Sequence, residues 1–165
     1  MRRLLGITGC CLLGTASAWA DPKLPGVFSD HMVLQRDMPA PVWGEAAPGE
    51  KITVKFRNQE KSATADDQGK WRVNLDPLTA GGPDKLVVSG SKTLEIDDVL
   101  VGEVWLGAGQ SNMAMLLREY TKGDPELAAL AEAGPYSRIR LIGVPRSPWQ
   151  VQVSGRWHVA DKANA

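Results

Sequence analysis

One segment of the chain has residues arranged for covalent chemistry, and its central residue is a serine. The nearly continuous apolar run from Val99 to Leu106 leads into the glycine-rich turn Gly107 to Gly109, and Ser111 follows two positions later. A serine in this place is held at the carboxyl edge of a sheet, where α/β folds bind their ligands. Backbone N–H groups at the start of a following helix could stabilise a developing oxyanion. A serine hydroxyl is a poor nucleophile unaided, so an imidazole is needed within hydrogen-bond reach.

A purely structural role for this serine is the alternative. Residues from Ser111 to Arg118 could form a helix, and Ser111 or Asn112 could cap its N-terminus. Strand-turn-helix junctions often carry Gly and Ser for this reason. The local chemistry alone favours capping over nucleophilic catalysis.

The residues before this segment predict short strands separated by turns. Apolar and polar residues alternate in stretches such as Ile52 to Arg57 and Trp71 to Leu75, and a period of two indicates a strand with one apolar face. Glycine, proline and aspartate fall between the strands, where the backbone must reverse. We therefore predict an antiparallel β-sandwich over residues 21–97. Its predicted core comprises Val54, Phe56, Trp71, Val73, Leu86 and Val88.

After Asp97 the pattern changes to one typical of an α/β layer. The run from Val99 to Leu106 predicts a strand buried on both faces. Asp124 followed by Pro125 predicts the start of a helix, with the aspartate as its cap. The stretch from Ile139 to Val144 predicts a second parallel strand. Strand, helix and strand in this order indicate the opening of a β-α-β unit, so residues 98–165 are predicted to begin a second, incomplete domain.

The first twenty residues have the features of an export signal. Arg2 and Arg3 supply positive charge, Leu4 to Leu13 is apolar, and Ala18 to Ala20 places small residues where a signal peptidase cuts. We expect the mature protein to begin at Asp21. The expected location is the periplasm or the extracellular space.

Cysteine content and composition exclude several classes of protein. Cys10 and Cys11 both lie within the signal, so the mature chain would have no disulfide and no thiolate metal site. Cys10 could alternatively be the modified residue of a lipoprotein signal, although the apolar stretch before it is short. Nineteen basic and nineteen acidic side chains balance, which argues against nucleic acid as a partner. The apolar stretch of the signal, Leu4 to Leu13, is shorter than the roughly 20 residues that a membrane-spanning helix needs.

The residues around the serine resemble those of a known family. The stretch Gly102-Glu103-Val104-Trp105-Leu106 leads into Gly109-Gln110-Ser111-Asn112-Met113. Together they closely resemble the nucleophile block of the sialate O-acetylesterase family, within the SGNH (GDSL-like) hydrolases. Further segments that resemble the N-terminal β region of that family, in the same order, are Phe28-Ser29-Asp30, Met32-Val33-Leu34-Gln35-Arg36, Val42-Trp43-Gly44, Pro48-Gly49-Glu50, Gly69-Lys70-Trp71 and Gly81-Gly82. With this resemblance, nucleophile becomes the favoured role for Ser111.

The resemblance implies hydrolysis of acetyl esters on sugars, with sialic acid or plant-type polysaccharides as candidate carriers. Ser111 would attack the acetyl carbonyl, a histidine would take its proton, and water would release acetate. Gly109, Gln110 and Asn112 would support the turn and the oxyanion. No metal or organic cofactor is implied, and the expected partner is an O-acetylated sugar or glycan. Gly107-Ala108 stands where family members usually carry Cys or Ser in the position before Gly-Gln-Ser.

Neither histidine of the chain fits the catalytic base of this family. SGNH hydrolases keep that histidine in an Asp-x-x-His block, yet Gly155 stands three residues before His158. We therefore expect His158 at the surface or in a loop, and His31 as a solvated histidine of a turn. The catalytic His and Asp are not identifiable, and the resemblance covers only the N-terminal portion of the family. The 165-residue chain alone is accordingly expected to be nearly inactive.

Two alternatives involve no catalysis by this chain. One is a sugar-binding β-sandwich module, in which Trp43 or Trp71 would stack on a sugar ring. Both tryptophans lie in predicted strands whose periodicity turns them toward the core, which favours packing over binding. The other alternative is an inactive fragment retained for contact with a partner.

Overall fold

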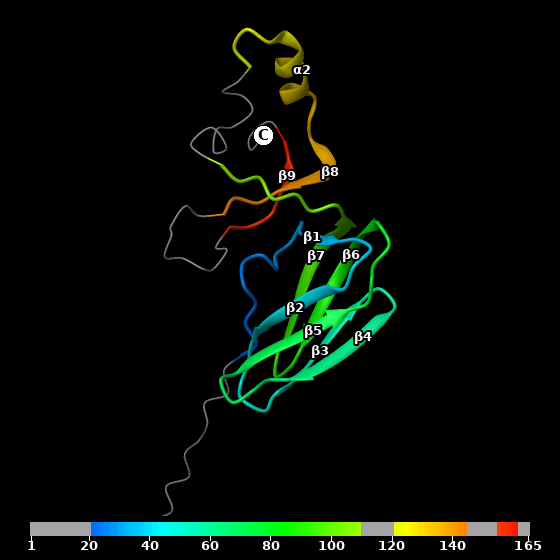
Figure 1. Ribbon diagram of the computed structural model, residues 1–165, viewed down its shortest axis with the longest axis vertical. Helices are drawn as coiled ribbons and strands as arrows, with labels where there is room; N and C mark the ends of the chain where they lie inside the picture. Colours follow the sequence, from blue (N-terminus) through cyan, green and yellow to red (C-terminus); the bar gives the residue numbers. More distant parts are fainter. Residues whose placement is uncertain (1–20, 110–120, 145–154, 162–165) are drawn as a thin grey trace, which may run out of the picture.

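The computed structural model describes residues 21–109, 121–144 and 155–161. Figure 1 shows one β region that contains β1 to β7, with α2, β8 and β9 beyond one end of it. The described elements are β1 (Val33–Gln35), β2 (Ala40–Glu45), β3 (Lys51–Phe56), β4 (Gln59–Thr64), β5 (Lys70–Leu75), β6 (Gly81–Ser89), β7 (Thr93–Gly102), α2 (Pro125–Ala133), β8 (Tyr136–Leu141) and β9 (His158–Ala160).

The β region consists of a mixed five-stranded sheet and a smaller two-stranded sheet. The larger sheet has the order β1-β7-β6-β3-β4, and the smaller one pairs β2 with β5. Every pair in the region is antiparallel except β1 with β7, which run parallel. The prediction of a wholly antiparallel arrangement is therefore wrong for β1. A period of two indicates a strand but says nothing about the direction of its neighbour.

The alternating strands bury the side chains that the sequence predicted. All six predicted core residues are buried, and they belong to one apolar cluster that receives side chains from both sheets. In β5, for example, Trp71 and Val73 face inward while Arg72 and Asn74 face solvent. The periodicity in these strands therefore identified the correct face.

Trp43 is a correction to that pattern. Its side chain is 41% exposed, and its ring meets Phe28 edge to face with 4.7 Å between the centroids. In β2 the residues on either side of it, Val42 and Gly44, face inward instead. The inward orientation expected for Trp43 is wrong, whereas the same expectation for Trp71 is confirmed.

The predicted strand from Val99 to Leu106 is displaced toward the N-terminus. The observed strand β7 begins at Thr93 and ends at Gly102, which is also the last residue paired with β1. Beyond it, Trp105 and Leu106 are 88% and 86% exposed. Among the described residues, no strand pairs with the chain after Gly102, so the rest of the apolar run has no ladder to join there.

The part of the chain beyond the β region confirms the predicted helix but not the predicted parallel strand. Asp124 caps α2 by accepting a hydrogen bond from the Leu127 N–H at 2.9 Å, and Pro125 is the first helical residue. The strand after the helix, β8, pairs antiparallel with β9. Among the described residues, no parallel β-α-β unit is present. No helix in these residues is long and apolar enough to span a membrane.

Glu50 is a buried carboxylate that holds two turns of the β region together. Its Oε1 accepts a hydrogen bond from the Ser91 N–H at 2.5 Å, and its Oε2 accepts one from the Ala47 N–H at 3.1 Å. The backbone hydrogen bond from Ser91 is the main reason that the pKa of Glu50 lies below its usual value, while burial opposes the shift. The carboxylate therefore stabilises the fold at pH values above the pKa that Glu50 has in the unfolded chain. That stabilisation is lost as the pH falls through the lower pKa of the folded state.

Replacing Glu50 by glutamine should lower the free energy of unfolding by about 1–3 kcal/mol at pH 7, because a backbone N–H loses its charged acceptor. The difference from the wild type should shrink as the pH falls below the ordinary pKa of glutamate and through the lower pKa of Glu50 in the folded state. Urea denaturation at pH 7 and pH 3 measures both effects. Glu60→Gln is the control, because Glu60 pairs with Lys55 at the surface and should change stability by less than about 0.5 kcal/mol. An equal loss for Glu50→Gln at both pH values would contradict a role for the charge.

Candidate functional site

The structure describes the approach to the predicted nucleophile but not the nucleophile itself. Gly109 is exposed and belongs to no helix or strand. Gln110, Ser111 and Asn112 lie outside the described residues. What the structure tests is how the β region holds the segment that leads to them.

The side chain of Gln35 holds the chain where it leaves β7. Its Oε1 accepts a hydrogen bond from the Val104 N–H at 2.8 Å. Its Nε2 donates to Glu103 Oε2 at 3.0 Å and to the Arg36 carbonyl at 3.3 Å. Gln35 is also the last residue of β1, where it is paired with Gly102. One amide therefore contacts both residues that follow the end of β7.

Arg36 adds a backbone and a charged contact at the same place. Its N–H donates to the Gly102 carbonyl at 3.0 Å. Its Nε lies 2.5 Å from Asp37 Oδ2 and 3.7 Å from Glu103 Oε1. These side chains are largely exposed, so their ion pairs contribute little free energy. The backbone bond is the contact that fixes the geometry.

His31, Asp98 and Arg140 form a second cluster, in which the Asp98 side chain on β7 contacts the other two. His31 Nδ1 lies 2.6 Å from Asp98 Oδ2, and Arg140 donates to both oxygens of the same carboxylate at 2.9 and 3.0 Å. The Arg140 side chain is only 3% exposed and also donates to the Ser137 carbonyl. His31 and Asp98 have φ values of 69° and 54°, a left-handed conformation that these residue types tolerate better than most. The cluster joins β8 to the β region.

The two histidines differ in how well the sequence predicted them. His31 was expected to be a solvated histidine of a turn, and it is 44% exposed but lies within hydrogen-bond distance of Asp98. No local pattern marks that pair, because its members are 67 residues apart. His158 is exposed on β9, so its surface position was predicted correctly.

Trp157 makes a further contact between the two parts of the chain. Its ring N–H donates to the Val27 carbonyl at 2.8 Å, and its backbone N–H donates to Ser29 Oγ at 3.3 Å. The ring is buried in the same apolar cluster as the strands. The turn before β1 therefore receives contacts from Trp157 and, through His31 and Asp98, from Arg140.

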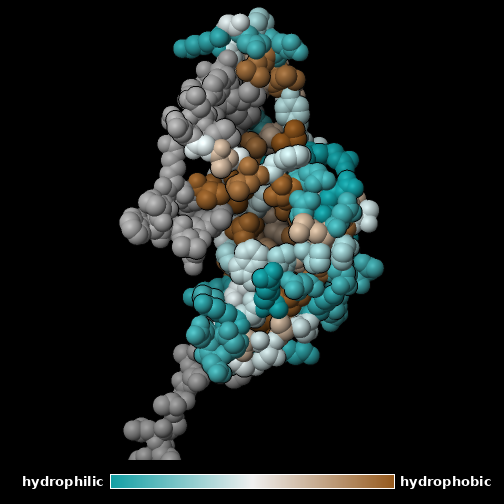
Figure 2. All heavy atoms as spheres, in the orientation of Figure 1, coloured by the Kyte–Doolittle hydropathy of each residue, from teal (hydrophilic) through white to brown (hydrophobic). Residues whose placement is uncertain are grey.

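Several large hydrophobic side chains are exposed in the part of the chain that follows β7. Figure 2 shows a hydrophobic area in the middle of one face of the molecule, between hydrophilic surfaces above and below. Within the described part of the chain, the exposed large hydrophobic residues beyond β7 are Val104, Trp105, Leu106, Leu130, Ile139, Leu141 and Val144.

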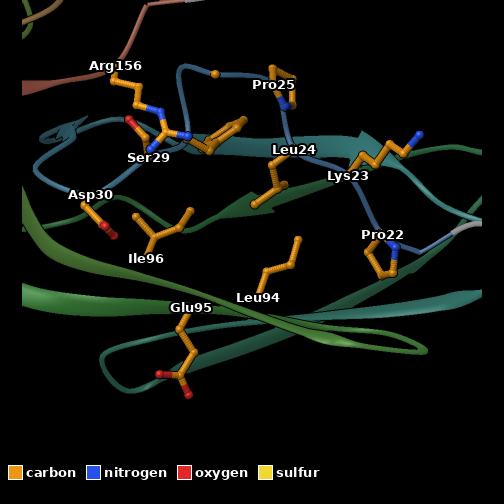
Figure 3. Close-up of a pocket in the computed structure, with 12 residues that line it drawn as sticks. Pro22, Lys23, Leu24, Pro25, Ser29, Asp30, Leu94, Glu95, Ile96 and Arg156 are labelled. Atoms are coloured by element: carbon orange, nitrogen blue, oxygen red, sulfur yellow. The ribbon is translucent and has the colours of Figure 1, made fainter.

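A shallow groove of about 600 Å³ lies between the N-terminal segment and β7. Figure 3 shows Leu24, Leu94 and Ile96 along its middle, with Arg156 and Asp30 toward one end. The groove is lined by both polar and apolar residues, and Lys23 lies at the end opposite Asp30 and Arg156. Within residues 21–109, 121–144 and 155–161, no group of three or more His, Cys, Asp or Glu side chains could hold a metal ion.

The chain is similar to curated sialate O-acetylesterases of mammals. It is 31% identical to the human protein over 152 residues, which cover 81% of this chain and 28% of the human protein. It is 34% identical to the mouse protein over 134 residues, which cover 74% of this chain and 24% of the mouse protein. The chain thus spans about a quarter of the length of these relatives. No protein-family model matches it.

A solved structure extends the similarity to three dimensions. A carbohydrate acetylesterase from Xanthomonas citri aligns with a TM-score of 0.79 and 38% sequence identity, over 87% of this chain and 33% of that one. The fold and the segment at the end of β7 therefore relate this chain to the carbohydrate acetylesterases. Within that class, the chain belongs to the sialate O-acetylesterase family, as its motifs indicated, and it matches a part of the length of the family's members.

Replacing Asp98 by asparagine should destabilise the protein by about 2 kcal/mol or more, because the buried Arg140 guanidinium loses its counter-charge. Asparagine tolerates the left-handed backbone at this position, so the change tests the charge rather than the conformation. Asp76→Asn is the matched control, since Asp76 is 68% exposed where it pairs with Lys61. Its loss should stay below about 1 kcal/mol. Urea denaturation compares the free energies of unfolding of the two variants. Similar losses would show that the Asp98 cluster contributes no more to stability than an exposed ion pair.

Proposed function

We propose that this chain is part of a carbohydrate O-acetylesterase that uses Ser111 as its nucleophile. The observation that carries the proposal is the likeness to the Xanthomonas citri acetylesterase, which extends over most of this chain. The segment Gly109-Gln110-Ser111-Asn112 supports the assignment of the nucleophile, because it has the residue types of the family's nucleophile block. The proposed substrate is an acetyl ester on a sugar or glycan.

In the proposed reaction the Ser111 hydroxyl attacks the acetyl carbonyl, and a histidine accepts its proton. The tetrahedral oxyanion is stabilised by backbone N–H groups of the turn, with Gly109, Gln110 and Asn112 as supporting residues. Collapse of this intermediate leaves an acetyl-serine ester, and the leaving sugar oxygen takes the proton from the histidine to form the free hydroxyl. Water then gives a proton to the histidine as it attacks the ester carbonyl; acetate is released, and the histidine passes that proton to the serine oxygen.

The described histidines do not supply a good base for this reaction. The His31–Asp98 pair has the contact expected of a base and its orienting carboxylate. The Arg140 guanidinium, however, lies on the same carboxylate and already neutralises its charge. His158 is exposed on a short edge strand. We therefore propose that the base comes from sequence beyond this chain, and that the chain alone turns over little substrate.

We further propose that residues 21–97 form a β-sandwich domain and that residues 98–165 are the opening of an SGNH-type hydrolase domain. The shared core of the two β sheets supports the first part. The change of sequence pattern after Asp97 supports the second. In this arrangement β7 continues from one domain into the other, since it runs through Asp97 and Asp98.

Sugar binding without catalysis is a second candidate function, and Trp43 is the observation that favours it. Its side chain is partly exposed, whereas Trp71 is buried. An exposed tryptophan face can stack on a sugar ring. The edge contact with Phe28 holds the Trp43 ring in a fixed orientation. Binding of an acetylated glycan that survives Ser111→Ala but is lost in Trp43→Ala would favour this function.

A longer form of the protein that includes a family-type Asp-x-x-His block should hydrolyse an aryl acetate, and Ser111→Ala should reduce its turnover by several orders of magnitude. The 165-residue chain should show nearly none. Ser62→Ala is the control, because Ser62 lies on β4, where its hydroxyl contacts Thr53, and turnover should be unchanged. Full activity in Ser111→Ala would remove the nucleophile assignment. Enzyme-like rates from the short chain would identify His31 or His158 as the base.

Export of the protein should remove the first twenty residues, because Ala18 to Ala20 presents small side chains at the positions that a signal peptidase recognises. N-terminal sequencing of protein recovered from the periplasm or the medium should begin at Asp21. Replacing Ala20 by a bulky residue should leave the precursor uncut. A mature chain that starts at Met1, or one that carries lipid on Cys10, would contradict the proposal.

A further inference from the structure

We propose that Gln35 is a positioning residue that sets where the nucleophile segment leaves the β region. The inference rests on the proposed function, because the position of this segment affects turnover only if Ser111 is the nucleophile. Its physical basis is the set of contacts that the Gln35 amide makes at the end of β7.

The backbone pairing between β1 and β7 ends where the segment begins. The register runs from Val33 with Leu100 to Gln35 with Gly102, and the Arg36 N–H adds one more bond to the Gly102 carbonyl. Asp37, the next residue, has φ of 57°, so the chain turns away from β7. From this point the backbone of β1 no longer supports its neighbour.

Where the backbone pairing ends, the Gln35 side chain makes the next hydrogen bonds to the chain after β7. Its carbonyl oxygen accepts from the Val104 N–H, as the backbone carbonyl of a neighbouring strand would. Its amide nitrogen holds Glu103 from the same position. A glutamine has one acceptor and one donor group at its tip, and both are used here on consecutive residues.

Beyond Val104 the chain has no such support within the described residues. Residues 105–109 belong to no helix or strand, and Trp105 and Leu106 are almost fully exposed. Among the described residues of this segment, the bond between Gln35 and Val104 is therefore the last one that holds it to the β region. A displacement of about 1 Å at a catalytic group can reduce a rate by about 100-fold, so loss of this bond should affect turnover more than substrate binding.

Three variants distinguish this positioning role from a general contribution of Gln35 to the stability of the fold. Gln35→Met keeps the length of the side chain but has no hydrogen-bonding tip. Gln35→Glu keeps an acceptor for the Val104 N–H but places a second negative charge beside Glu103. Adding Glu103→Gln to Gln35→Glu restores a donor and an acceptor in exchanged positions and should rescue the contact.

Gln59 provides a matched control. It lies on β4, and its amide holds the backbone of Asp76 at 2.8 Å and 3.3 Å, much as the amide of Gln35 holds Val104. Gln59→Met therefore removes a contact of the same kind on another strand. It should affect stability about as much as Gln35→Met does.

The first measurement is hydrogen exchange at Val104 in the 165-residue chain. Gln35→Met should speed exchange at Val104 by about three- to tenfold, as expected for the loss of one hydrogen bond. Gln59→Met should leave Val104 unchanged. Unchanged exchange in Gln35→Met would show that the contact does not hold the segment, and this would overturn the proposal whether or not the protein is an esterase.

The second measurement is hydrolysis of an aryl acetate by the longer form of the protein. Gln35→Met should lower kcat at least about tenfold with KM within about twofold, Gln59→Met should change neither, and the exchanged double variant should recover most of the loss. Wild-type kcat in Gln35→Met, despite faster exchange at Val104, would overturn the catalytic role. Absence of hydrolysis by the wild type would instead overturn the proposed function, while the exchange measurement would still decide whether Gln35 holds the segment.

Discussion

The parallel pairing of β1 with β7 is the contact on which the rest of the described structure depends. It places the turn before β1 against Asp97 and Asp98, and the residues after β1 against Gly102 and Glu103. A slip of one residue would turn every side chain of β1 to the opposite face. The buried Leu34 side chain opposes such a slip, because it would move into solvent. The polar contacts at both ends of this pairing are therefore determined by apolar packing in its middle.

The features that sequence alone predicted correctly depend on short-range patterns. Alternation in β3 and β5 identified the buried face because one side of each strand meets the core. The cap of α2 could be predicted because Asp124 lies only three residues before the N–H that it accepts from. Trp43 was assigned to the wrong face because Ala40 to Trp43 are all apolar, so that this run has no alternating phase to read.

The features that sequence did not predict join residues that are far apart along the chain. Asp98 is 67 residues from His31 and 42 from Arg140, and no local pattern links such positions. The direction of β1 and the early end of β7 are likewise decided by neighbours that are distant in sequence. Of the candidate site, the structure describes the approach. The role proposed for Ser111 rests on family resemblance, because local chemistry alone favoured a helix cap.

The sequence distance between β1 and β7 also affects the order in which the chain can fold. The pairs β3–β4 and β6–β7 are joined by short turns, so each can form soon after its residues are synthesised. β1 has to close a much longer loop before any of its pairing is gained, and such non-local contacts slow folding. The edge of β7 that β1 covers would stay open during that interval. An open edge can pair with another chain, so the strand that supports the approach to Ser111 also protects the newly made protein from association.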